Sequence, residues 1–360
     1  MKILQKTVIR PYDIVLNSSF EGLKEQILTV NTPSSICIIT DSHIAPLYLE
    51  QIKAIADQIA PTYAHVFEAG EESKNITTVT AIYDTLLAHN MDRSSLIIAL
   101  GGGVTGDIAG FVAATYMRGV PFVQLPMTIV AQNDSSIGGK VGIDYLNHKN
   151  MVGAFNNPSL VYINTTVLKT LPQRELVGGL AEVIKHGVIE DIELFRYLMS
   201  HRKQILELDD AAILEMTYKS CKVKCDIVEQ DPKEKGIRKI LNFGHTIGHA
   251  IETLSQFKYN HGECVAYGMC GAAFISYKRQ LLTLERVNEI VTLCRSFGLL
   301  KPLGDYRAQD IWQHMAYDKK KAHGKIAFIL LKAVGTTSIV TDISEDEVAQ
   351  AITFIKETCL

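Results

Sequence analysis

Short apolar runs alternate with stretches of helical spacing along the first half of the chain. These runs are four or five residues long, are rich in Ile, Val and aromatic residues, and lie at 36–40, 63–67, 96–100, 122–125 and 160–164. They are typical of buried strands. Apolar residues at helical spacing lie between them, as at 48–59 and 76–89. Strands that alternate with helices predict a parallel, doubly wound sheet, which binds ligands at the carboxyl ends of its strands.

The pattern changes near residue 171. From there to about Met315 the apolar spacing is helical, and one further apolar run, at 326–331, predicts a late strand. A chain of 360 residues that is 47% hydrophobic can bury a full core in two domains. We therefore predict an α/β domain over 1–174 that binds a nucleotide cofactor, and a mainly α-helical domain over 175–360 that binds metal and substrate.

A glycine-rich turn follows the strand predicted at 96–100. It runs Gly101-Gly102-Gly103-Val104-Thr105-Gly106-Asp107 and leads into a helical pattern. Strand, glycine turn and helix form the setting in which G-x-G-x-x-G holds a pyrophosphate, because backbone N–H groups and a helix N-terminus face the phosphate. A turn with only a packing role is the alternative. The acidic residue expected about 20 positions later is missing, so Asp41 is the candidate ribose contact and the domain is a Rossmann-like variant.

Charged and amide side chains gather after this turn. Asp134 and Lys140 flank a Ser- and Gly-rich stretch, and Lys149 and Asn150 follow closely. Lys74 likewise follows a predicted strand, where a ligand site of such a sheet belongs. Their density on glycine-rich loops predicts the polar floor of an active site rather than a solvated loop.

The helical half contains residues that can bind a metal. Five candidates lie on three predicted helices: Glu182, His186, His245, His249 and His261. A carboxylate and histidines from separate helices can converge on one divalent cation and leave a position open for substrate. Spacing does not decide which of the five bind metal, and any one histidine can instead be a packed or capped helix residue. The H-x-x-x-H spacing lacks the glutamate of H-E-x-x-H, which disfavours peptide hydrolysis.

Basic residues cluster in three further places. Two clusters, 219–224 and 235–239, lie between the metal candidates, and within the second Arg238 precedes Asn242 by one helical turn if a helix already begins there. The third, around Lys319 and Lys320, fits either a surface loop or a lid over a phosphate.

Composition removes several classes of function. A net charge of −3 and a pI near 6.4 argue against a nucleic-acid or membrane surface, so the basic clusters would serve small anionic ligands. The N-terminus lacks the apolar core of a signal peptide, and no apolar run approaches the ~18 residues of a membrane span. Seven cysteines without a C-x-x-C pair predict reduced thiols. We expect a cytoplasmic enzyme.

The motifs of the whole chain, in their order and spacing, resemble those of the 3-dehydroquinate synthase family of sugar-phosphate cyclases. They are GGGVTGDIAGFVAATYMRG, DSSIGGK, HKNMVGAF, GLAEVIKHG, GIRKILNFGHTIGHAIE and HGE. The resemblance implies a lyase of the shikimate pathway that makes 3-dehydroquinate and phosphate from 3-deoxy-D-arabino-heptulosonate 7-phosphate. It also implies NAD and zinc, or cobalt in its place, with transient C5 oxidation, phosphate β-elimination, re-reduction, ring opening and aldol closure.

The resemblance also implies roles for individual residues. The metal ligands would be Glu182, His245 and His261, which leaves His186 structural. The NAD contacts would be Asp41, Glu71, Lys74, Gly102, Gly103, Asp107, Thr128, Lys149, Thr170 and Leu171. The substrate pocket would use Asp134, Lys140, Lys149, Asn150, Lys185, Lys224, Arg238, Asn242, His249 and Lys319 or Lys320. Arg118 would reach the neighbouring subunit of a homodimer. Met127 departs from the family, where threonine is common.

Three other functions compete with this interpretation. A metal-dependent polyol dehydrogenase shares the fold but would release NADH and would not need the basic set Lys140, Lys149, Lys224 and Arg238. A related cyclase that makes an aminocyclitol or valiolone precursor acts on sugar phosphates without a carboxylate, and would be expected to differ at Arg238 and Asn242. A non-enzymatic NAD-binding regulator would be expected to lack the metal ligands.

Overall fold

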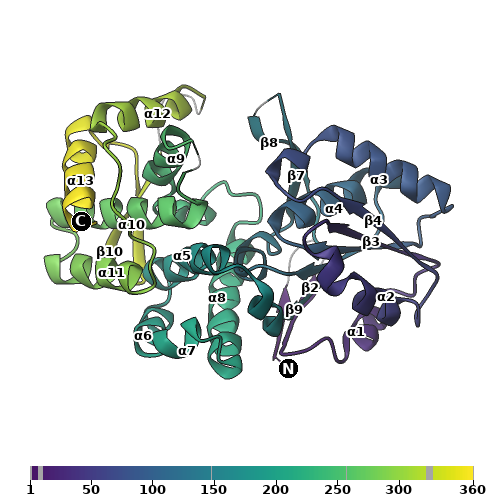
Figure 1. The fold of residues 1–360 in the computed structure, drawn as a ribbon. Coiled ribbons are helices and arrows are strands. Elements are labelled where there is room, and N and C mark those ends of the chain that lie inside the picture. Colours follow the sequence, from purple (N-terminus) through teal and green to yellow (C-terminus); the bar gives the residue numbers. More distant parts are fainter. Residues whose placement is uncertain (1, 7–10, 147, 257, 322–326, 360) are drawn as a thin grey trace. The chain divides into compact units, whose positions relative to one another are not determined.

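The computed structural model describes residues 2–6, 11–146, 148–256, 258–321 and 327–359, and for 2–6 and 316–321 it describes only the course of the backbone. The chain forms two compact units (Figure 1). The first comprises Met1–Leu171 with Lys224–Pro232, and the second comprises Pro172–Val223 with Lys233–Leu360. Residues 224–232, which the sequence analysis placed with the helical half, therefore group with the sheet.

The first unit is built on a seven-stranded sheet with the order β1-β2-β9-β6-β5-β3-β4. In this sheet β1 pairs with β2 in the antiparallel direction. The pairs β2–β9, β9–β6, β6–β5, β5–β3 and β3–β4 are all parallel. The strands are β1 (Lys2–Lys6), β2 (Tyr12–Asn17), β3 (Ile36–Asp41), β4 (Thr62–Phe67), β5 (Leu96–Gly101), β6 (Phe122–Pro126) and β9 (Leu160–Asn164). The predicted fold class is confirmed for this unit, and β1 and β2 extend the sheet beyond the predicted strands.

Both faces of this sheet are buried, because alternate side chains of each strand enter different cores. Cys37 and Ile39 pack on one face, against the side of α3 (Ile76–Ala88) and α4 (Gly103–Thr115). Ile36 and Ile38 pack on the other, with α1 (Leu23–Val30) and α2 (Glu50–Ala56). Helices on both faces direct ligands to the carboxyl edge of the strands.

The stretch predicted as a glycine-rich loop is an antiparallel hairpin of β7 (Lys140–Tyr145) and β8 (His148–Phe155). Gly142 and Gly153 face each other across the two strands. A Cβ atom on Gly153 would lie 2.3 Å from the carbonyl oxygen of Val141. These glycines therefore allow a close approach of two backbones, and the loop prediction was wrong for this segment.

The second unit is mainly helical, as predicted. Its elements are α5 (Gln173–Ile189), α6 (Ile192–Ser200), α7 (Arg202–Leu206), most of α8 (Asp210–Gln230), η6 (Ile237–Asn242), α9 (His245–Leu254), α10 (His261–Lys278), α11 (Leu284–Ser296), α12 (Ala308–Lys321), β10 (Phe328–Ala333), β11 (Thr336–Val340) and α13 (Glu345–Thr358). Helix α10 is buried on nearly all sides and contacts α5, α9, α11, α13 and β10, so it forms the centre of this unit.

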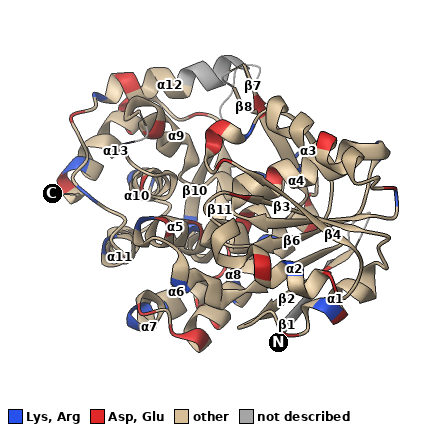
Figure 2. Ribbon diagram, turned by 45° about the vertical axis from the view of Figure 1, so that its right-hand side comes forward, with Lys and Arg blue, Asp and Glu red and all other residues tan. Residues whose placement is uncertain are grey.

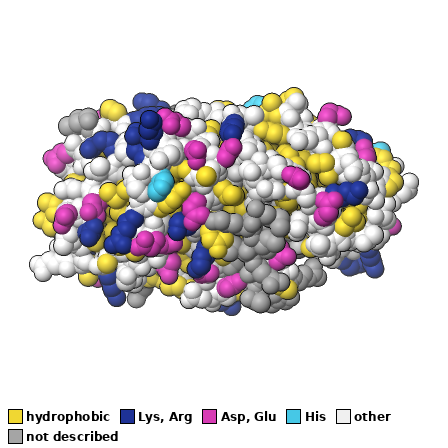
Figure 3. Space-filling view, turned by 90° about the horizontal axis from the view of Figure 1, so that it is seen from below, with side chains coloured by type: hydrophobic (Ala, Val, Ile, Leu, Met, Phe, Trp, Pro, Cys, Tyr) yellow, Lys and Arg dark blue, Asp and Glu magenta, His cyan; other side chains and the backbone are white. Residues whose placement is uncertain are grey.

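Acidic and basic side chains are interspersed along the helices (Figure 2), and the face in Figure 3 mixes apolar, basic and acidic side chains. Among the helices of the described residues, none has the length and apolar character needed to cross a bilayer. All seven cysteines are buried thiols.

Candidate active site

Three side chains from three helices of the second unit converge. Glu182 lies in the middle of α5, His245 begins α9 and His261 begins α10. The Oε1 atom of Glu182 lies 3.4 Å from Nε2 of His245 and 3.3 Å from Nε2 of His261. Two ligands about 2.1 Å from a tetrahedral zinc ion would be roughly 3.4 Å apart, so this set of one oxygen and two nitrogens fits such an ion.

Glycine contacts bring these helices together. A Cβ atom on Gly262 would lie 1.9 Å from the carbonyl oxygen of Gly178, so the start of α10 can approach α5 only with glycine there. Likewise, a Cβ atom on Gly268 would lie 1.8 Å from the carbonyl oxygen of Gly244, just before α9. A capping box between Asn260 and Glu263 fixes the first turn of α10, and with it His261.

The second ring nitrogen of each histidine faces an acceptor. Nδ1 of His245 lies 3.2 Å from the carbonyl oxygen of Phe243, and Nδ1 of His261 lies 3.4 Å from Oε2 of Glu252. An acceptor at Nδ1 leaves Nε2 to bind a metal. The sequence analysis missed Glu252. Its position seven residues after His245 and three after His249, on one side of a helix, was the available signal.

The electrostatics of the triad match a metal site. Burial works to raise the pKa of Glu182, but the charges of Lys185 and His245 outweigh it and hold that pKa well below its usual range. Partial burial works to lower the pKa of His261, but hydrogen bonds to Glu182 and Glu252 raise it to about 10. A metal ion would take the place of the proton on Nε2.

The other two histidines of the five candidates lie differently. His186 is fully buried, and its Nδ1 lies 2.8 Å from the hydroxyl of Ser220. His249 is exposed, with its ring centroid 5.3 Å from that of His245 and 5.7 Å from that of His261. His249 can also form a second possible metal group with Glu252 and His261.

Three further predicted substrate residues with described side chains lie in the same unit. Lys185 is buried and ion-paired with Oε2 of Glu182. Arg238 is 2% exposed and is one of the largest buried side chains of the described chain. Asn242 is exposed and donates a hydrogen bond from Nδ2 to Oε1 of Glu234, 3.1 Å away. The helix does not already begin at Arg238: a separate 3₁₀ turn, η6, carries Arg238 and Asn242.

In the first unit, the predicted NAD contacts lie at the carboxyl ends of strands. Gly102 caps α4 and Gly103 is its first residue. A Cβ atom on Gly102 would lie 3.2 Å from the side chain of Thr128, which follows β6. Asp41 ends β3, and its Oδ2 accepts a hydrogen bond from the hydroxyl of Thr105, 2.9 Å away. Thr170 and Leu171 lie at the end of η5 (Thr165–Thr170), after β9.

A polar network joins the predicted cofactor residues to the hairpin. Lys74 is buried, and its Nζ lies 2.6 Å from Oδ2 of Asp107 and 2.5 Å from Oδ1 of Asn150. Burial raises the pKa of Asp107 to about 6, although Lys74 opposes this. Asn150 has a φ of 56°, and its N–H donates to Asp144 at 2.7 Å. Asp144, which the sequence analysis did not select, therefore holds the backbone that presents Asn150.

Further predicted residues lie in the same unit. Nζ of Lys149 lies 3.8 Å from Oε1 of Glu71. Nζ of Lys224 lies 2.5 Å from Oδ1 of Asp134, and Asp134 belongs to a single π-turn, η4 (Ala131–Ser135), of a kind frequent at functional sites. Lys140 is exposed and begins β7.

Three predicted residues lie outside these groups. Arg118 is exposed on a turn in which it and Met117 both have positive φ, 68° and 49°. Lys319 and Lys320 lie near the end of α12, where the side chains are outside the described residues.

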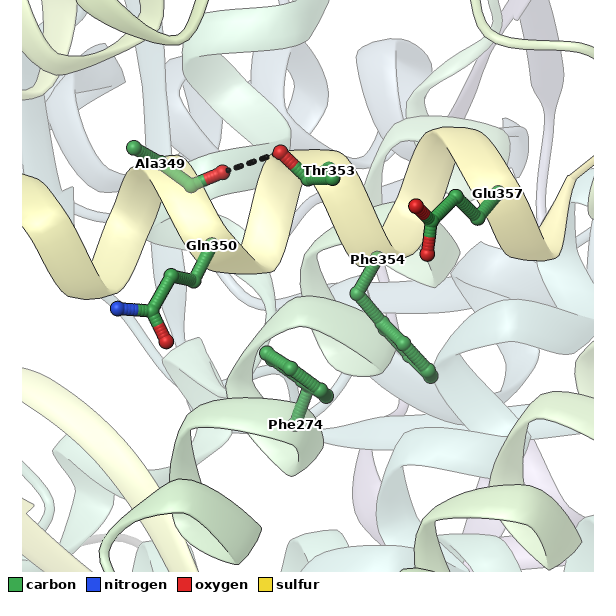
Figure 4. A pocket seen from close by; sticks show the side chains of 6 residues that line it. All are labelled: Phe274, Ala349, Gln350, Thr353, Phe354 and Glu357. Atoms are coloured by element: carbon green, nitrogen blue, oxygen red, sulfur yellow. Dashed lines mark hydrogen bonds between the residues drawn. The ribbon is translucent and has the colours of Figure 1, made fainter.

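A pocket of about 360 Å³ lies elsewhere, over α10 and α13 (Figure 4). Phe274 and Phe354 stack there with centroids 4.4 Å apart. The remaining lining residues are Ala349, Gln350, Thr353 and Glu357. None of the predicted site residues lines it.

Comparison with known proteins identifies the family. The 3-dehydroquinate synthase N-terminal model matches residues 64–178, and the 3-dehydroquinate synthase C-terminal model matches residues 179–321. The 3-dehydroquinate synthase of Acetivibrio thermocellus is 42% identical over 350 residues, which are 97% of each chain. The chain belongs to the 3-dehydroquinate synthase family. This confirms the resemblance on which the residue roles were based.

Solved structures of related cyclases have the same fold. The 2-epi-5-epi-valiolone synthase of Streptomyces hygroscopicus subsp. jinggangensis 5008, with NAD+ and Zn2+ bound, is 27% identical with a TM-score of 0.87 over 99% of both chains. A 2-deoxy-scyllo-inosose synthase, complexed with carbaglucose-6-phosphate, NAD+ and Co2+, is 25% identical with a TM-score of 0.85 over 99% of both chains. The predicted fold class is therefore confirmed.

Proposed function

We propose that this member of the 3-dehydroquinate synthase family converts 3-deoxy-D-arabino-heptulosonate 7-phosphate into 3-dehydroquinate and phosphate. NAD would bind at the carboxyl edge of the sheet, and a divalent metal, zinc or cobalt, would bind Glu182, His245 and His261. The observation that carries this proposal is the 3.3–3.4 Å convergence of two imidazole Nε2 atoms on one buried carboxylate oxygen. The bound NAD+ with Zn2+ or Co2+ in the related cyclases supports the same cofactors.

The two groups would supply the reactivity. NAD accepts and returns a hydride, and a divalent metal lowers the pKa of a hydroxyl that it coordinates, as it does for water. The chain holds Glu182 ionised for this purpose, because the Lys185 charge opposes the effect of burial on its pKa. Lys185 lies against Oε2 and leaves Oε1 to face the two histidines.

Fixed cations would bind the two anionic ends of the substrate. Arg238 would bind the carboxylate, since its planar guanidinium can donate two parallel hydrogen bonds. Lys140, Lys149 and Lys224 would serve the phosphate and the developing charge. The contact between Lys224 and Asp134 supports this, because it holds the ammonium in one place and provides a carboxylate that can exchange a proton with a ligand.

A neighbouring subunit would complete the site through Arg118. Two consecutive non-glycine residues with positive φ cost free energy, about 1–3 kcal/mol each, and such strain is typical of functional positions. The strained turn holds Arg118 away from the core in an exposed position. A homodimer in which Arg118 reaches the partner's substrate phosphate accounts for this. We propose the cytoplasm as its location, as expected for an enzyme with reduced thiols.

The test is phosphate release with substoichiometric NAD. Many phosphates should be released per NAD, while NADH absorbance stays near its baseline, because the hydride is returned before product leaves. Lys140→Ala should bind NAD as the wild type does and release no phosphate. Accumulation of one NADH per substrate consumed would contradict the synthase and favour a polyol dehydrogenase. Turnover of glucose 6-phosphate, which has no carboxylate, in preference to the heptulosonate phosphate would favour a related cyclase.

A further inference from the structure

Glu252 has no role among those implied by the family resemblance, although it contacts the metal cluster. It lies on α9, two turns after His245, and its side chain is 15% exposed. Its Oε2 lies 3.4 Å from Nδ1 of His261, across the gap between α9 and α10. The Nε2 atom of the same ring lies 3.3 Å from Oε1 of Glu182. The His261 ring is therefore held between two carboxylates.

The two nitrogens of one imidazole cannot act independently. If Nε2 gives its lone pair to a metal, Nδ1 carries the proton of the neutral ring. The Nδ1–H group then needs an acceptor for its hydrogen bond. Glu252 provides this acceptor, and a carboxylate at that place fixes the ring orientation and makes Nε2 a stronger ligand. His245 differs, because its Nδ1 faces only the neutral carbonyl of Phe243 at 3.2 Å. The two histidines of the cluster are thus supported by acceptors of different charge.

We propose that Glu252 is a positioning residue for the metal centre, which holds His261 with Nδ1 protonated and Nε2 directed at the metal. The inference rests on the metal site proposed above. Glu252 does not touch the metal in this arrangement. It sets the affinity of the site and the direction of one ligand.

A competing arrangement would place the metal between His249, Glu252 and His261, which also lie close enough to share an ion. If Nδ1 of His261 bound that ion, Nε2 would carry the proton and could no longer act as a ligand beside Glu182. Glu182 is only 2% exposed and faces both histidine Nε2 atoms, whereas His249 is exposed. The Glu182 side thus offers two Nε2 atoms within 3.4 Å of one carboxylate oxygen, which favours Glu252 as a support rather than a ligand.

The experiment is a titration of the metal-free full-length protein with Co2+, followed through its visible absorption bands. Variants would be Glu252→Ala, Glu252→Gln, Glu182→Ala and His249→Ala, with NAD affinity and circular dichroism as controls of folding. Glu252→Ala should raise the Kd for Co2+ by about 10- to 100-fold and alter the bands. Glu252→Gln should raise it less, because the amide oxygen still accepts the hydrogen bond without the charge.

A second readout reports on the hydrogen bond itself. In Zn2+-loaded wild type, NMR of the histidine rings should show a downfield Nδ1–H proton for His261 that exchanges slowly with water. Glu252→Ala should lose this signal to exchange, and Glu252→Gln should retain it at a less downfield position. If Glu252→Ala fails to fold, Glu252→Gln decides the question, and wild-type affinity together with a wild-type Nδ1–H position would overturn the proposal.

The variants separate failure of this inference from failure of the proposed metal site. Loss of Co2+ binding in Glu182→Ala, together with unchanged binding in Glu252→Ala, would overturn the role of Glu252 alone. Unchanged binding in Glu182→Ala would overturn the metal site, and with it this inference. Retention in Glu182→Ala with loss in both His249→Ala and Glu252→Ala would assign the metal to the competing group and overturn both.

Discussion

The ammonium nitrogen of Lys74 lies 2.6 Å from the carboxylate of Asp107, which follows the glycine turn in the first turns of α4. Both side chains are predicted to contact NAD, and both are already bound to each other in the structure. The same ammonium lies 2.5 Å from Asn150 on the hairpin β7–β8. Lys74 is therefore the link between the predicted cofactor residues and a predicted substrate residue.

Lys74→Met should weaken NAD binding and also destabilise the first unit. Asp107 would lose the cation that opposes burial, so its pKa should rise above the present value of about 6. Removal of one member of a largely buried pair costs about 2–4 kcal/mol, somewhat less than for a fully buried one. Calorimetric NAD titration and denaturant unfolding would measure the two effects. The double variant Lys74→Met/Asp107→Asn should recover most of the stability without recovering NAD affinity, and recovery of both would show that neither side chain contacts NAD.

Removal of His245 should reduce metal content and turnover together. His245→Ala deletes one of the three proposed ligand atoms, whereas His186→Ala deletes a buried hydrogen bond to Ser220. We expect His186→Ala to keep its metal and to lose about 1–3 kcal/mol of stability. Elemental analysis of the purified variants and thermal unfolding would measure these effects. The ligand assignment is wrong if His186→Ala loses the metal while His245→Ala retains it.

Local apolar patterning predicted the sheet, because a buried strand is recognisable from an apolar run of four to six consecutive residues. The five predicted strands match β3, β4, β5, β6 and β9 to within one residue at each end. The hairpin β7–β8 was missed because glycine and polar residues interrupt its apolar pattern. Glycine is required at positions 142 and 153 because the backbone of the opposite strand lies too close for a Cβ atom. The sequence of one strand alone does not indicate this contact.

The candidate site could be predicted in its residue types but not in its arrangement. His245 and His249 are one turn apart on α9, and spacing gives no reason to prefer either as a ligand. The proposed choice of His245 rests on the approach of α5 and α10, which depends on contacts such as Gly178 with Gly262. Glu252 was missed for the same reason, since its partner lies on another helix. Contacts between helices are tertiary information that periodicity does not contain.

Lowering the pH should remove the contribution of the Arg279–Glu347 pair to the stability of the second unit. Arg279 donates hydrogen bonds from Nε and a terminal nitrogen to the two carboxylate oxygens of Glu347, at 2.5 and 2.9 Å, which ties α10 to the start of α13. This hydrogen bonding lowers the pKa of Glu347 to about 2. In the unfolded chain a glutamate has a pKa of about 4.3. The lowered value in the folded state means that the contribution is present above about pH 4.3 and is lost as the pH falls toward 2.

Glu347→Gln should therefore reduce the decrease in the free energy of unfolding that the wild type shows as the pH falls from about 4.3 toward 2. At neutral pH it should cost about 1–2 kcal/mol, after allowance for partial solvent screening of the pair. Below pH 2, where the carboxyl group is protonated in the folded state as well, the variant and the wild type should be equally stable. Denaturant unfolding across this range would measure both curves, with Glu357→Gln as a control, since Glu357 lies exposed on the same helix. Parallel curves for wild type and Glu347→Gln would contradict the prediction.

Arg238→Lys should discriminate between substrates that do and do not carry a carboxylate. Arg238 is almost fully buried on η6, so its guanidinium would meet the proposed ligand in a site with little water. A lysine keeps the positive charge but cannot form two parallel hydrogen bonds to a carboxylate. Binding of the heptulosonate phosphate should weaken by about 1.5–3 kcal/mol, the range for hydrogen bonds to charged groups, whereas binding of an analogue without the carboxylate should change little. Calorimetric titration of both ligands would measure this difference, with Lys224→Arg as a control that should affect both ligands alike. Equal losses for the two ligands in Arg238→Lys would instead assign Arg238 a structural role in the second unit.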